Sequence, residues 1–90
     1  MRKAIITVLG KDRTGIIAAV SGRLAQCEVN VLDITQTILQ EYFTMIMLVD
    51  LASSALPFDE IKRSLAELGE ELGMNIRIQH EDIFNTMHSI

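Results

Sequence analysis

Residues 10–15, which read Gly-Lys-Asp-Arg-Thr-Gly, lie where a short apolar run ends and an amphipathic pattern begins. A junction between a strand and a helix points backbone N–H groups of the first helical turn at whatever occupies the turn. If this chain binds a small anionic or zwitterionic molecule, we expect it at this turn. Arg13 could attract an anion there, although a solvated turn residue is the plainer interpretation.

Each of these residues also has a purely structural interpretation. Gly10 and Gly15 are residues that a tight turn requires, and Asn30 can end a turn before the strand that follows it. Asp12 or Thr14 can cap the helix through a side-chain oxygen. We expect Asp12 to be used in this way.

Other residues that could carry chemistry are isolated from the partners they would need. Cys27 falls on the apolar side of the first helical pattern, which predicts a small buried hydrophobe rather than a nucleophile. The spacing of His80, Glu81, Asp82 and His88 matches no metal-ligand pattern. With no phosphate-binding fingerprint either, the sequence predicts no enzyme, no metal and no cofactor.

Composition narrows the class of protein further. The 90 residues carry a formal charge of −4 and are 49% hydrophobic, which indicates one globular domain without the basic surface of a nucleic-acid or anionic-membrane binder. No apolar run approaches the roughly 18 residues that span a bilayer. The first residues lack the pattern of a secretory signal, and the chain has a single cysteine. Both features predict a cytoplasmic protein.

Hydrophobic periodicity predicts six elements in the order β, α, β, β, α, β. The expected strands cover residues 3–9, 29–39, 42–51 and 74–79, and the expected helices cover residues 14–27 and the segment from Pro57 to Gly73. This order predicts an α+β, ferredoxin-like fold with a four-stranded antiparallel sheet and two helices on one face. Right-handed crossovers give the spatial order second, third, first, fourth strand, with the fourth at an edge.

Two finer expectations come from the alternation within the elements. In the second strand, Leu32, Ile34 and Ile38 are predicted to share one face. In the first helix, Arg23 is predicted to point outward.

The first and third strands are apolar on both faces, although the helices cover only one. An exposed apolar face marks an interface, so something must cover it. Residues 1–80 form the expected domain, and residues 81–90 form a tail with Ile83, Phe84, Met87 and Ile90 at helix-like spacing. The tail could cover the open face of its own sheet or that of a partner subunit, or it could simply fray.

The Gly-x-Asp-Arg-Thr-Gly turn, the Ile-Ile helix start and the later segment at residues 28–34 (Glu-Val-Asn-Val-Leu-Asp-Ile) resemble the ACT domain, a small regulatory module that binds amino acids. Among ACT domains, the chain is similar to the stand-alone type and, more distantly, to the glycine-cleavage repressor type. The resemblance covers about residues 3–80.

This resemblance implies a homodimer that pairs through its second strands and holds an amino acid between two subunits. The implied site comprises the turn of one subunit and the start of the second strand of the other, with the residues Gly10, Asp12, Arg13, Thr14, Gly15, Ile16 and Asn30. Gly15 would let the chain approach a ligand carboxylate, and Asn30 would supply a donor and an acceptor.

The turn departs from the serine-sensing pattern His-x-Asn-Arg-Pro-Gly at Gly10, Asp12 and Thr14, so the resemblance does not name the amino acid. The function expected is non-catalytic regulation of a partner protein. The alternative is an assembly module that binds no ligand.

Overall fold

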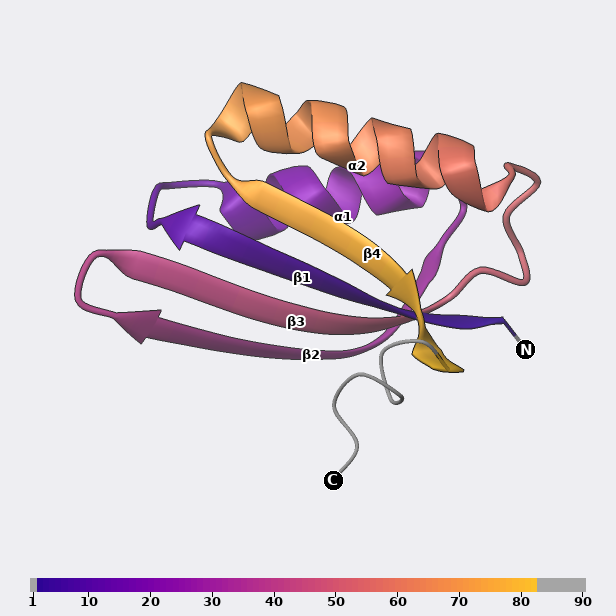
Figure 1. Cartoon of the computed structure of the whole chain (residues 1–90), viewed down its shortest axis with the longest axis horizontal. Helices are drawn as coiled ribbons and strands as arrows, with labels where there is room; N and C mark the ends of the chain where they lie inside the picture. Colours follow the sequence, from indigo (N-terminus) through magenta and orange to yellow (C-terminus); the bar gives the residue numbers. More distant parts are fainter. Residues whose placement is uncertain (1, 83–90) are drawn as a thin grey trace.

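The computed structural model describes residues 2–82, which form one sheet and a layer of two helices (Figure 1). In chain order the elements are β1 (Lys3–Lys11), α1 (Ile16–Gln26), β2 (Asn30–Leu39), β3 (Tyr42–Asp50), α2 (Phe58–Leu72) and β4 (Asn75–His80). The strands lie in the order β2-β3-β1-β4, and each neighbouring pair is antiparallel. Both helices lie on the same face of the sheet in Figure 1. The predicted ferredoxin-like fold, strand order and edge position of β4 are therefore confirmed.

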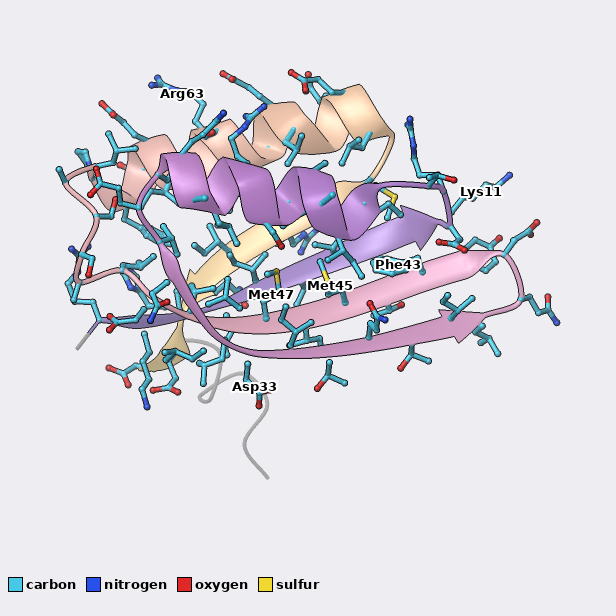
Figure 2. The ribbon with its side chains drawn as sticks, turned by 180° about the vertical axis from the view of Figure 1, so that it is seen from behind. Lys11, Asp33, Phe43, Met45, Met47 and Arg63 are labelled. Atoms are coloured by element: carbon cyan, nitrogen blue, oxygen red, sulfur yellow. The ribbon has the colours of Figure 1, made fainter. Side chains whose placement is uncertain are left out.

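The core lies between the sheet and the helices, because alternate residues of the central strands point to that side. Figure 2 shows Phe43, Met45 and Met47 of β3 directed toward the helix layer, and all three are buried. Ile16, Val20 and Leu24 of α1 pack onto them in the same core cluster. Cys27 is also buried there, as the sequence predicts.

The junction between β1 and α1 differs from the prediction in its bounds. β1 continues through Gly10 and Lys11, which pair with Phe43 and Tyr42 of β3, so these two residues belong to the sheet rather than to the turn. α1 begins at Ile16 instead of Thr14, and its N-cap is Gly15 in the left-handed conformation (φ 86°). A residue without a Cβ adopts this conformation at little cost, so the turn ends at Gly15.

β2 contains an irregularity that the alternation in the sequence does not indicate. Its register against β3 shifts between Val31, which lies opposite Val49, and Asp33, which lies opposite Leu48. Leu32 is the extra residue of this β-bulge and has no place in the alternation. The register confirms that Ile34 and Ile38 share a face, and Val31, opposite Val49, lies on the same side, whereas Leu32 has no partner on β3.

The two helices are joined by a side chain that the helical pattern placed in solvent. Arg23 of α1 donates from Nη1 to the backbone oxygen of Ser64 (2.8 Å) and to its Oγ (3.1 Å). Its Nη2 lies 3.7 Å from a carboxylate oxygen of Glu71 on α2. The outward prediction for Arg23 is wrong because a long side chain can reach across to the neighbouring helix.

α2 follows the prediction closely. Pro57 is its N-cap, and Gly73 ends it in the left-handed conformation (φ 69°). The apolar stripe contributes Ile61, Leu65 and Leu68 to the core. The predicted docking of the tail concerns residues 83–90, which lie outside the described residues.

A candidate ligand site at the start of helix α1

A pocket of about 230 Å³ lies between the start of α1 and the sheet, near the ends of β2 and β3. Two groups of residues line it. The turn and the first helical turn contribute Asp12, Arg13, Gly15, Ile16, Ile17 and Ala18, and the strands contribute Gln36, Ile38 and Phe43.

The helical side of the pocket presents the backbone N–H groups of the first turn of α1, which no side chain caps. The first backbone hydrogen bond within the helix runs from the Ala19 N–H to the Gly15 oxygen (2.9 Å). The N–H groups of Ile16, Ile17 and Ala18 precede it and have no acceptor one turn earlier in the helix. No side chain caps α1, and its first turn carries no acidic residue. A carboxylate placed here would gain hydrogen bonds and the favourable end of the helix dipole.

The turn that leads into α1 is held at two points. The Asp12 N–H donates to the Glu41 oxygen in the β2–β3 turn (2.7 Å). The Arg13 Nη1 donates to the backbone oxygen of Leu72, the last residue of α2 (3.1 Å). A cation at the C-terminal end of a helix is favourable, so Arg13 has a structural role of its own. The interpretation of Arg13 as a merely solvated residue is therefore wrong.

Two structural interpretations of the turn fail or change in the structure. The capping prediction is wrong for both Asp12 and Thr14, because neither side chain bonds to the first turn of α1. Gly10 lies in β1 rather than in a turn, and a Cβ at this position would lie 2.5 Å from Met74 Sδ, so the flexible Met74 side chain would have to move. Gly15, by contrast, has open space where its Cβ would be.

The structure brings together only part of the predicted site. Asp12, Arg13, Gly15 and Ile16 line the pocket, whereas Gly10 and Thr14 do not. Asn30 is the first residue of β2 and lies opposite Asp50, at the other end of the strand from the pocket. Within one subunit Asn30 therefore cannot contact a ligand held at the turn.

The sheet wall of the pocket was not identified from the sequence. The register places Ile34, Gln36 and Ile38 opposite Met47, Met45 and Phe43, so all three lie on the helix side of β2. Gln36 is thus a polar residue between two apolar ones on one face, and this was the signal available in the sequence. Its amide can donate and accept, while Ile38 and Phe43 supply apolar surface.

A larger hollow of about 500 Å³ lies elsewhere, where Arg2 and Lys3 meet His80, Glu81 and Asp82. It combines charges of both signs and includes no start of a long helix. Within residues 2–82, no three His, Cys, Asp or Glu side chains are close enough to hold a metal ion. In the same residues no helix has the length and apolar character needed to cross a membrane.

Comparisons with known proteins identify the family and the relatives of this chain. Residues 2–79 match the ACT domain family. The chain is 59% identical over 88 residues to a UPF0237 protein of Clostridium acetobutylicum, and the alignment spans 98% of this chain and 99% of that protein.

Two solved structures share the fold. An ACT domain protein from Streptococcus pneumoniae is 43% identical, with a TM-score of 0.81 over 92% of this chain and 93% of that one. A putative glycine cleavage system transcriptional repressor is 25% identical, with a TM-score of 0.75 over 88% of this chain and 45% of that one.

Proposed function

This chain belongs to the ACT domain family, and from that premise we propose that it is a non-catalytic sensor of a small amino acid or related metabolite. The ligand binds at the start of α1, in a pocket shared between two copies of the chain. Ligand binding in turn regulates a partner protein. The observation that carries this proposal is the start of α1. It has no side-chain cap and no acidic residue in its first turn, and it opens into a pocket.

The chemistry of the pocket favours an amino acid over other small molecules. The ligand carboxylate would accept from the N–H groups of the first turn, and the Asp12 carboxylate on the rim suits the ammonium group. Ile38 and Phe43 leave an apolar wall for a side chain. The volume of about 230 Å³ is below the roughly 300–1,000 Å³ of pockets for drug-sized ligands, which favours a single small metabolite.

The second copy is expected along β2. This strand is an edge of the sheet, and Ile34, Ile38 and Leu39 expose 40%, 56% and 70% of their surface. An exposed apolar edge strand is a template for pairing with another strand. Two β2 strands that pair antiparallel would give one continuous sheet.

That pairing supplies the role of Asn30. If the twofold axis passes near Ile34, the partner's Asn30 lies opposite Ile38, within the one-residue offset of the bulge at Leu32. Ile38 lines the pocket, so the partner's Asn30 would reach its rim. Because the ligand then contacts both subunits, its binding tightens the dimer by linkage.

A panel of amino acids tested by thermal shift and analytical ultracentrifugation checks the proposal. We expect one or a few members to raise the Tm and to lower the dissociation constant of the dimer. Asn30→Ala should remove the ligand effect while keeping the fold. Asn75→Ala is the matched control, since Asn75 is the first residue of the other edge strand and is also exposed.

Two results would contradict the proposal. One is a monomer at all concentrations, because the site would then be incomplete. The other is a dimer that no member of the panel stabilises and that carries no small molecule in native mass spectrometry. The second result would favour the assembly module.

A further inference from the structure

We propose that Gln36 of β2 selects the side chain of the ligand and favours an uncharged amino acid whose side chain ends in a hydroxyl or carboxamide group. This inference rests on the proposed function, because it concerns the molecule held at the start of α1. Every amino acid offers a carboxylate and an ammonium group to that site, so a sensor needs a further contact to tell one amino acid from another.

Gln36 lies on the helix side of the sheet, beside the pocket. It pairs with Met45 of β3, and Figure 2 shows Met45 directed toward the helix layer. Residues directly opposite each other in a sheet share a face, so the Gln36 side chain lies on that side as well. Its neighbours on this face, Ile34 and Ile38, are apolar. Among residues 2–82, Gln36 is therefore the polar side chain that the sheet contributes to the pocket wall.

The Gln36 amide has hydrogen-bonding capacity to offer a ligand. In the part of the chain that the structure describes, it makes no hydrogen bond to another residue. A carboxamide has donor hydrogens and an acceptor oxygen, which a ligand hydroxyl or carboxamide can match with a donor and an acceptor of its own. When the ligand and the second copy displace water from the pocket, an amide left unpaired costs free energy. A hydrocarbon side chain should therefore bind less tightly.

The ionic groups of the pocket disfavour a charged side chain. Arg13 directs its guanidinium to the C-terminal end of α2, where it donates to the Leu72 oxygen at 3.1 Å. An acidic side chain would meet the Asp12 carboxylate on the rim, which repels it. A basic side chain would lie beside the positive end of the α1 dipole. An uncharged polar side chain avoids both costs.

The apolar wall beside Gln36 suits the carbon atoms of such a side chain. Ile38 lies two residues further along β2 and opposite Phe43, and both residues line the pocket. A methyl or methylene group of the ligand would pack against them, while its terminal polar atoms would reach Gln36. The pocket volume of about 230 Å³ suits a single small amino acid.

Calorimetric titration with two pairs of amino acids of similar shape tests this selection. Threonine is compared with valine, which has a methyl group in place of the hydroxyl. Asparagine is compared with leucine, which has two methyl groups in place of the carboxamide oxygen and nitrogen. In the wild-type chain we expect the polar member of at least one pair to bind at least about tenfold more tightly than its apolar counterpart.

Gln36→Leu removes the amide at a similar side-chain size, so the ratio of affinities within that pair should fall to about one, chiefly through weaker binding of the polar member. Thr37→Val is the control. It removes a polar group from the next position of β2, which lies opposite Thr44 on the face away from the helices. This variant should keep the wild-type ratio.

Two results would overturn the inference and leave the proposed function standing. One is a wild-type chain that binds amino acids but does not discriminate within either pair. The other is a Gln36→Leu variant that keeps the wild-type ratio. If no amino acid binds the wild type, the proposed function fails and the inference fails with it. If Gln36→Leu does not fold, Gln36→Ala at this exposed position replaces it and should lower the ratio in the same way.

Discussion

The starts of the two helices differ in how the positive end of the helix dipole is neutralised. Neither α1 nor α2 has a side-chain cap. α2 places Asp59 and Glu60 in its first turn, whereas α1 has no acidic residue there and opens into a pocket. A helix start that its own carboxylates neutralise has a structural role, and one left bare beside a pocket can accept an external carboxylate.

The ends of the helices show the same division. Arg13, which leads into α1, donates to the last carbonyl of α2, so its charge is used to hold two elements together. The donors that remain in the pocket include the backbone N–H groups of the first turn of α1 and the Gln36 amide. In the proposed function, the difference between the two helix starts favours the backbone of α1 over charged side chains as the group that binds the ligand carboxylate.

The largest effect is expected when an acidic residue, like those in the first turn of α2, is introduced into the first turn of α1. Ala18 is exposed in the first turn of α1, so Ala18→Glu should fold normally and compete with the ligand carboxylate. At a ligand concentration of about 100 Kd, the variant should lose the roughly 2.7 kcal/mol of stabilisation that binding provides. Thermal shift with the identified ligand measures this loss.

Ala25→Glu, an exposed position near the other end of α1, is the matched control and should keep the ligand response. Equal responses from the wild type and Ala18→Glu would show that the first turn does not hold the carboxylate.

The N-cap of α1 gives the next largest effect. Gly15→Ala should lower the free energy of unfolding by about 1–2 kcal/mol, because alanine is strained at a positive φ even though its Cβ meets open space. Gly22→Ala, inside the same helix and equally unhindered, should raise it by about 0.5–1 kcal/mol. Urea unfolding compares them, and a Gly15→Ala variant as stable as wild type would contradict the observed turn geometry.

A smaller effect is expected for the contact between the turn and α2. Arg13→Met removes the hydrogen bond to the Leu72 carbonyl from an exposed position, so the free energy of unfolding should fall by about 0.5–1 kcal/mol. The Tm shift caused by ligand should be kept. If ligand binding were lost and stability unchanged, Arg13 would be a ligand residue rather than a contact between elements.

The smallest effect is expected at the start of α2. Asp59→Asn and Glu60→Gln should each cost about 0.3–1 kcal/mol in dilute buffer, and less in high salt, where the interaction with the helix dipole is screened. Chemical unfolding at two salt concentrations measures this. A loss of ligand response in either variant would mean that the two helix starts are not separate in function.

The architecture could be predicted because it depends on features with a local period. Apolar residues at helical spacing gave α2 its stripe, and Gly73 gave its end. The two-sided apolar character of residues 42–51 gave β3 its central place. These patterns mark the side chains that are buried in the core, and the burial of apolar side chains is the main force that stabilises the fold.

The details of the site depended on contacts between distant parts of the chain. Arg13 and Arg23 reach partners 59 and 41 residues away, and Gly10 lies beside the side chain of Met74. The bulge at Leu32 shifted the register of β2 against β3. No local pattern reports such contacts, so the turn was located from the sequence but its bounds and its opposing wall were not.

A mixing experiment with two inactive variants tests the shared pocket most directly. Ala18→Glu damages the pocket side of a site, and Asn30→Ala damages the side expected from the partner. If each site combines both subunits, a heterodimer of the two variants has one site with both changes and one with neither. Refolding the variants together should restore up to about half of the sites in the heterodimer, whereas each variant refolded alone should bind nothing. Binding that is not restored in verified heterodimers would contradict a pocket completed by the second subunit.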